Sequence, residues 1–102
     1  MWTAIVEEFS KKPRDIHTVP IQKREPKWFF VFCQKGNVYI ESAHEYEPAS
    51  DITGKRMMNK DEFEDMLEIY HRRCNGEQVS QEAQDRTINQ VYWYGIFAEL
   101  KL

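Results

Sequence analysis

The chain has 102 residues, which is enough for one ordinary domain but too few for a core built around a large internal cavity. Charged residues make up 30% of the chain and aromatic residues 14%, so it carries the apolar side chains that a disordered protein lacks. The net charge of −3 excludes an overall polycation. We therefore expect one small globular domain that spans residues 1–102.

The charge is unevenly distributed along the chain. Residues 1–36 contain seven Lys/Arg and four Asp/Glu, a net charge of +3, whereas residues 37–102 contain seven Lys/Arg and thirteen Asp/Glu, a net charge of −6. The first third can therefore attract an anionic partner, and the remainder would repel one.

The N-terminal third predicts one short helix and a long connection. Apolar residues recur at helical spacing between Trp2 and Phe9, although a strand is the alternative because residues 4–6 are β-prone. Residues 10–27 contain three prolines and six Lys/Arg, so we expect an extended connection with one edge strand at 17–22.

A β-hairpin is predicted over residues 28–42. Two β-prone runs flank Gly36, and a two-residue turn at 35–36 or 36–37 joins them, the second of which suits a type II′ turn. Either register places the same five apolar side chains on one face: Phe29, Val31, Cys33, Val38 and Ile40. The other face then carries Phe30, Phe32, Tyr39 and Glu41, so both faces are rich in large apolar groups.

A third strand is expected within 51–58, and a helix follows at about 60–74. Asn59 is a suitable N-cap, and Glu62 three residues later resembles the second half of a capping box. The helix has an apolar stripe of Phe63, Met66, Leu67, Tyr70 and Cys74.

The C-terminal segment predicts a second helix over about 81–100, with Ser80 as its N-cap. Residues 91–98 are apolar nearly all round, which is typical of a helix buried on several sides. A strand over 88–98 is the alternative, because Val, Tyr, Trp, Ile and Phe favour strands. Together these elements predict an α+β fold: a small antiparallel sheet of three or four strands, with two C-terminal helices packed on one face.

The sequence contains no recognisable catalytic or metal-binding motif. His44, Glu45 and Glu47 share one loop, and His71 and Cys74 share one helix, but the paired ligand spacing of a structural zinc site is absent. Neither a nucleophile elbow nor a phosphate-binding loop is present, and two cysteines are too few for a disulfide framework. We expect no metal, no cofactor, no catalytic residues and no enzymatic activity.

The surplus of apolar side chains favours a binding or adaptor module that forms a homodimer or docks another protein. The C-terminal helix cannot hide all its rings against one sheet and one helix, so we expect Trp93 or Phe97 to face outward. The candidate interface residues are Trp93, Tyr94 and Phe97, or the face of Phe30, Phe32 and Tyr39.

Two other functions remain open. The segment 23–32 interleaves cations with aromatic rings, and a nucleic-acid-binding protein could use Lys23, Arg24, Lys27 and Trp28 for phosphate attraction and base stacking. A small enzyme or ligand-binding protein with an aromatic-lined pocket is the third hypothesis. The sequence has neither a recognisable signal peptide nor an apolar run of about 18 residues, so we expect a cytoplasmic protein that does not contact membranes.

Overall fold

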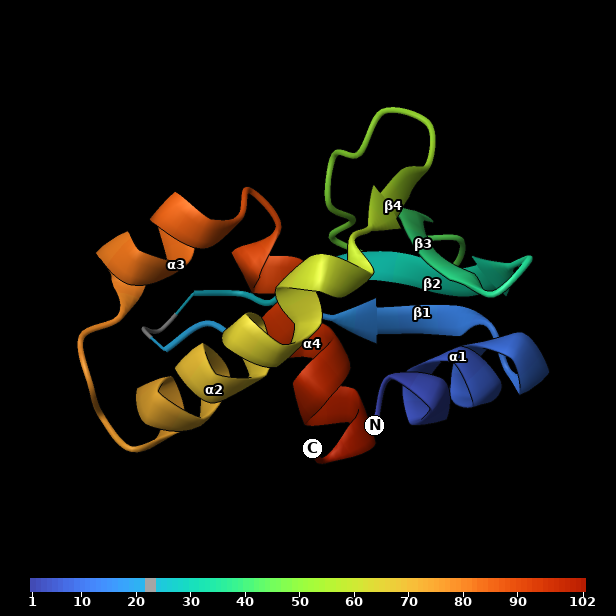
Figure 1. The fold of residues 1–102 in the computed structure, drawn as a ribbon. Coiled ribbons are helices and arrows are strands. Elements are labelled where there is room, and N and C mark those ends of the chain that lie inside the picture. The colour runs from blue at the N-terminus through green and yellow to red at the C-terminus, as the bar shows by residue number, and fades with distance from the viewer. Residues whose placement is uncertain (22–23) are drawn as a thin grey trace.

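The computed structural model describes residues 1–21 and 24–102, and its centre is a four-stranded antiparallel sheet (Figure 1). The strands follow the chain order β1-β2-β3-β4 across the sheet. The elements are α1 (Trp2–Lys11), β1 (Arg14–His17), β2 (Trp28–Gln34), β3 (Asn37–Ser42), β4 (Arg56–Met58), the 3₁₀ turn η1 (Lys60–Glu62), α2 (Phe63–Cys74), α3 (Ser80–Arg86) and α4 (Gln90–Leu100). This arrangement confirms the predicted α+β class.

The helices lie on one side of the sheet. Helices α1 and α4 pack directly on it, α2 packs on α4, and α3 packs on α2. The first helix is confirmed, since its spacing buries Ile5 and Phe9 completely. Within the described residues, no helix is both long and apolar enough to cross a membrane.

The edge strand β1 begins earlier than the sequence suggested. It spans Arg14–His17, directly after the helix, rather than 17–22, and residues 22–23 lie outside the described part of the chain. Pro13 explains the early start, because it ends α1 and favours an extended backbone beside it.

The hairpin uses the first of the two predicted registers. Gln34 pairs with Asn37, so the turn consists of Lys35 and Gly36. Both have positive φ, 51° for Lys35 and 78° for Gly36, which is the signature of a type I′ turn. The predicted faces are confirmed, with Phe29 and Val31 fully buried on the helix side.

The expected single helix over 81–100 is wrong, because the segment breaks into α3 and α4. Thr87 adopts an extended conformation (φ −159°, ψ 153°), and its hydroxyl oxygen accepts the N–H of Asn89 at 3.0 Å. The same hydroxyl donates to the Glu62 carboxylate at 2.7 Å. Short polar side chains compete for backbone groups in this way and interrupt helices.

The capping box that the sequence predicts at Asn59 and Glu62 forms only in part. Asn59 Oδ1 accepts the N–H of Asp61 at 2.9 Å and so caps η1. The Glu62 side chain does not return a bond to the Asn59 backbone N–H, because its carboxylate accepts the Thr87 hydroxyl and the Trp93 indole N–H. This carboxylate therefore joins η1 to α4 instead of closing a capping box.

Helix α4 is buried on several sides by its own chain. Trp93 and Phe97 are fully buried, so the expectation that one of them faces outward is wrong. The Trp93 ring lies 6.1 Å from Trp2 of α1, and the Phe97 ring lies 5.9 Å from Phe63 and 5.5 Å from Tyr70 of α2. The expectation counted one sheet and one helix as cover, whereas α1 covers a further flank.

The closest approach between helix and sheet occurs at Gly95 of α4. A Cβ atom placed there would lie 2.8 Å from the backbone oxygen of His17 and 2.9 Å from the Phe29 ring. Real Cβ atoms do not come this near to backbone, so glycine lets α4 rest directly on β1 and β2.

Gly95→Ala should therefore destabilise the protein by about 2 kcal/mol or more, because the added methyl group overpacks the core. The sign is informative, since the same change at an exposed helical position stabilises by up to about 1 kcal/mol. Urea denaturation of both proteins measures the difference, and a neutral or stabilising result would contradict the close packing.

The turn yields a pair of substitutions with opposite expected signs. Gly36→Val should destabilise by about 1–2 kcal/mol, because a β-branched residue resists positive φ. Lys35→Asn should stabilise by about 0.5 kcal/mol, since Asn-Gly is the preferred type I′ sequence. No atom lies within 4 Å of a Cβ built at Gly36, so the cost there is conformational and not steric. Thermal melts of both variants that shift in the same direction would contradict a type I′ turn.

Candidate functional site

The sheet face opposite the helices is lined with aromatic rings. We call it the aromatic face; its members are His17, Trp28, Phe30, Phe32 and Tyr39 of the strands, with His44 and Tyr46 of the following loop. The strand residues share a face because Trp28 pairs with His17 and Phe32 pairs with Tyr39 across the sheet. All are half-buried or exposed, while the alternate residues on the helix side are buried.

The rings form two groups on this face, one of His17, Trp28 and Tyr46 and one of Phe30, Phe32, Tyr39 and His44. The Trp28 ring lies 4.9 Å from His17 and stacks on Tyr46 at 4.3 Å. The Phe32 ring lies 5.9 Å from Phe30 and stacks on Tyr39 at 5.6 Å. Aromatic pairs at these separations attract each other beyond their burial of area, so they hold a defined surface.

The hairpin end of this face is cationic. The Lys55 ammonium lies 4.7 Å from the centre of the Tyr39 ring and donates to Gln34 Oε1 at 2.8 Å. Lys35 in the turn is exposed. Met57, which pairs with Tyr39 and is 49% exposed, adds an uncovered apolar group beside the Tyr39 ring.

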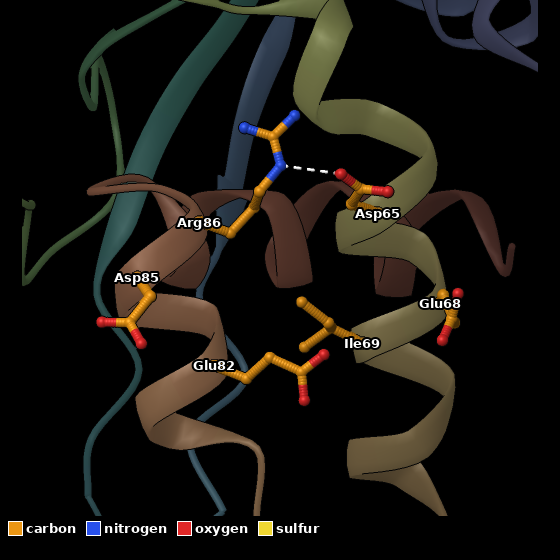
Figure 2. A pocket seen from close by; sticks show the side chains of 6 residues that line it. All are labelled: Asp65, Glu68, Ile69, Glu82, Asp85 and Arg86. Atoms are coloured by element: carbon orange, nitrogen blue, oxygen red, sulfur yellow. Dashed lines mark hydrogen bonds and ion pairs between the residues drawn. The ribbon is translucent and has the colours of Figure 1, made fainter.

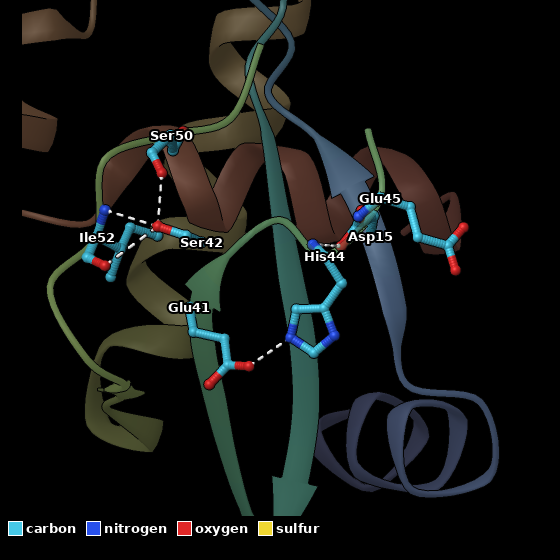
Figure 3. Close-up of polar contacts among 7 residues, drawn as sticks. All are labelled: Asp15, Glu41, Ser42, His44, Glu45, Ser50 and Ile52. Atoms are coloured by element: carbon cyan, nitrogen blue, oxygen red, sulfur yellow. Dashed lines mark hydrogen bonds and ion pairs between the residues drawn. The ribbon is translucent and has the colours of Figure 1, made fainter. Parts of the chain in front are cut away.

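A strap of residues 43–47 crosses the other end of the face (Figure 3). One carboxylate holds it in place. Asp15 of β1 accepts hydrogen bonds from the backbone N–H groups of His44 at 2.9 Å, Glu45 at 2.7 Å and Tyr46 at 3.0 Å. Asp15 is therefore the hydrogen-bond acceptor for three backbone N–H groups of the strap that would otherwise bond to solvent.

The strap covers the aromatic face through its own rings. His44 stacks on Phe30 with a centroid distance of 3.6 Å and an interplanar angle of 3°. His44 Nε2 also donates to the carboxylate of Glu41 on β3. Glu45 and Glu47 are exposed, so this end of the face is acidic.

Backbone and hydroxyl bonds hold the chain on both sides of the strap. The Ser42 hydroxyl donates to the Ser50 carbonyl at 2.9 Å and accepts the Ile52 N–H at 3.2 Å. Trp28 then exchanges two 2.8 Å bonds with the returning chain, donating to the Pro48 carbonyl and accepting the Ser50 N–H. The strap is thus an excursion between two fixed points.

Two opposing effects act on the Asp15 carboxyl group. Burial alone raises its pKa, but the backbone N–H groups of His44, Glu45 and Tyr46 outweigh burial and lower the pKa below its ordinary value. The charged form is therefore the one that holds the strap.

The predicted site residues divide into two groups. Phe30, Phe32 and Tyr39 come together on the aromatic face, while Trp93, Tyr94 and Phe97 lie in the core and offer no surface. Of the alternative nucleic-acid residues, Arg24 and Lys27 are exposed, Trp28 belongs to the aromatic face, and Lys23 lies outside the described residues.

Sequence reasoning missed four members of the aromatic face, His17, Trp28, His44 and Tyr46. Period-two alternation along β2 would have added Trp28 to Phe30 and Phe32. No local pattern identifies His44 and Tyr46, because they belong to a loop whose position depends on the distant Asp15.

A groove between α2 and α3 is lined by carboxylates, not by aromatic rings (Figure 2). Its lining residues are Asp65, Glu68, Ile69, Glu82, Asp85 and Arg86. Arg86 binds Asp65 at 2.8 Å, and Arg72 of α2 binds both carboxylate oxygens of Glu82 at 2.8 and 2.9 Å. These ion pairs join the two helices, so the groove has the character of a polar seam.

The described residues contain no group of three or more His, Cys, Asp or Glu side chains that could hold a metal ion. His71 instead lies 3.2 Å from the backbone oxygen of Leu102. Burial raises the pKa of the Cys33 thiol, with a smaller opposing effect from a hydrogen bond with Ser10, which disfavours the reactive thiolate.

Asp15→Ala should destabilise the protein by about 1–3 kcal/mol at neutral pH, because three N–H groups lose a charged acceptor. Since the pKa of Asp15 is lowered in the folded state, its contribution is complete above about pH 4–5 and is lost as the pH falls through the folded-state value. The difference in unfolding free energy between wild type and variant should therefore shrink near pH 3.

Urea denaturation near pH 7 and near pH 3 measures this difference. Asp51→Ala, which removes an exposed carboxylate just beyond the strap, is the control and should change stability by less than about 0.5 kcal/mol. An Asp15 effect that is equal at both pH values would contradict the anchoring role of the charge.

No protein-family model, curated protein or solved structure matches this chain. The features of the aromatic face that bear on function are its two groups of rings, the strap across it, and the opposite charges at its two ends.

Proposed function

We propose that the protein is a non-enzymatic binding module that self-associates through the aromatic face. The observation that carries the proposal is the presence of two groups of rings on one sheet face, opposite the face on which the helices of the described residues pack. Phe, Tyr, Trp and Met are enriched at the centres of protein interfaces, where charged groups are depleted. Phe32, Tyr39 and Met57 make such a centre.

The charges at the two ends of the face favour a second copy as the partner. The hairpin end carries Lys35 and Lys55, and the strap end carries Glu45 and Glu47. A twofold axis that lies between the two sheets and runs across the strands puts the hairpin end of each copy over the strap end of the other. Both pairs of opposite charges then meet in one symmetric arrangement, and closed twofold dimers are the commonest oligomers.

The size of the face indicates a weak, reversible dimer. Strands of 4, 7, 6 and 3 residues, at about 3.3 Å per residue and about 4.8 Å apart, span about 300 Å² per copy. Two copies bury about 600 Å² in total, below the about 1,200–2,000 Å² of standard stable interfaces. We therefore expect a dissociation constant of about 10–100 μM.

One observation favours nucleic acid as a second candidate partner. Aromatic rings on the open face of a four-stranded sheet are a known platform for stacking single-stranded bases. Arg24 and Lys27 lie close in sequence to the first of these rings, Trp28. The exposed carboxylates of Glu45 and Glu47 oppose it, because phosphates need cations beside the stacking rings.

Substitution of the central rings tests the proposal. Sedimentation of the wild type between about 5 and 500 μM should show a monomer–dimer equilibrium. Phe32→Ser and Tyr39→Ser should each weaken it at least tenfold, because they remove apolar area from the centre of the interface. Ile88→Ser is the matched control, since Ile88 is 81% exposed in the helix layer.

Charge reversal tests the orientation of the two copies. Lys55→Glu or Glu47→Lys alone should weaken association, and both together should restore most of it. A wild type that stays monomeric throughout the range would contradict the proposal, and so would an equal effect of Ile88→Ser. Salt-sensitive binding of a labelled single-stranded oligonucleotide by a monomeric wild type would favour the nucleic-acid function instead.

A further inference from the structure

We infer that the strap of residues 43–47 is a displaceable cover of the aromatic face, and that its release from Asp15 uncovers Trp28 and Phe30 for the second copy. The inference rests on the proposed self-association and adds its regulation. Three features support the inference: the bonds from the strap to Asp15, the fixed residues at both ends of the strap, and the rings that the strap covers.

The middle of the strap has one polar anchor to the opposite edge of the sheet. Its three bonds from His44, Glu45 and Tyr46 all end on the single carboxylate of Asp15. None of these three residues is buried, and Tyr46 is 51% exposed. No apolar side chain of His44–Glu47 enters the core, so without Asp15 the middle of the strap is held by the contact of His44 with Glu41 and by ring stacking on the sheet face.

The hydrogen bonds that fix the chain on both sides of the strap do not involve residues 43–47 themselves. Ser42 is fixed to Ser50 and Ile52, and Trp28 is fixed to Pro48 and Ser50. These bonds hold both ends of the excursion in place. The strap can therefore lift without breaking a strand pair, since the pairing of β2 with β3 ends at Phe29 and Ser42.

The contacts that the strap makes with the face are of a kind that a second copy can replace. His44 covers Phe30 and Tyr46 covers Trp28, in both cases by ring stacking. Rings of a second sheet provide the same type of contact. In the symmetric arrangement proposed above, the closed strap also stands between the two sheets, so lifting its middle lets them approach each other. Glu47 adjoins Pro48, which remains bonded to Trp28, so a carboxylate stays at this end of the face.

Amide hydrogen exchange tests whether the strap is a separate unit. In the wild type, the amides of His44, Glu45 and Tyr46 should be protected despite their exposed side chains, because Asp15 accepts all three. Asp15→Ala should speed their exchange at least tenfold, while the amides of Val31 and Ile40 in the central strands keep their rates. Asp51→Ala should change neither set.

Two exchange results would overturn the inference. Strap amides that exchange in the wild type as fast as in an unfolded peptide would show that Asp15 does not hold them. Faster exchange of the Val31 and Ile40 amides in Asp15→Ala, in step with the strap, would show that the strap opens only when the sheet does.

Sedimentation of the same variants tests the regulatory role. Asp15→Ala should tighten self-association about tenfold, and Asp15→Ala combined with Phe30→Ser should remove that gain, whereas Asp51→Ala should behave as wild type. Unchanged or weaker association of Asp15→Ala would contradict the strap as a cover. Monomers at every concentration in all forms would contradict the proposed self-association, and the exchange data would still decide whether the strap moves alone.

Discussion

The close contact of α4 with the sheet at Gly95 is the constraint on which the rest of the structure depends. The absence of a side chain there brings the helix onto the His17 carbonyl and the Phe29 ring. At that depth, the rings of Trp93 and Phe97 reach both α1 and α2, and one cluster closes the core. A larger residue at Gly95 would push the helix outward and loosen all of these contacts together.

This packing explains why one sheet face is left open. The helices lie on the side of Phe29 and Val31. There, α1 and α4 pack on the buried apolar side chains of the sheet, and α2 packs on α4. Of the described residues, it is the strap of residues 43–47 that crosses the other face, where its backbone N–H groups bond to Asp15. The molecule thus combines a closed aromatic core with an aromatic surface that is partly covered by the strap, whose backbone N–H groups bond to Asp15.

The two aromatic clusters differ in what they can do. Trp93 and Phe97 at the centre of the core cluster are fully buried, and the Trp93 indole N–H donates to Glu62, so this cluster contributes to stability. The rings of the aromatic face are only partly buried, and Lys55 and His44 sit directly on them. Weak polar and stacking contacts of this kind exchange readily with a partner, which suits reversible association better than permanent assembly.

Local patterns in the sequence were sufficient for the elements with strong signals. Alternation along residues 28–42 determined the hairpin and its two faces, and helical spacing determined α2, because each depends on contacts between near neighbours. The same spacing favoured α1 but left a strand as the alternative. The turn register, the break at Thr87 and the cover over Trp93 were decided by tertiary structure. The aromatic face was only half visible in the sequence, since its strap is positioned by Asp15, about thirty residues earlier in the chain. Such long-range bonds leave no periodic trace, and only the folded chain brings their partners together.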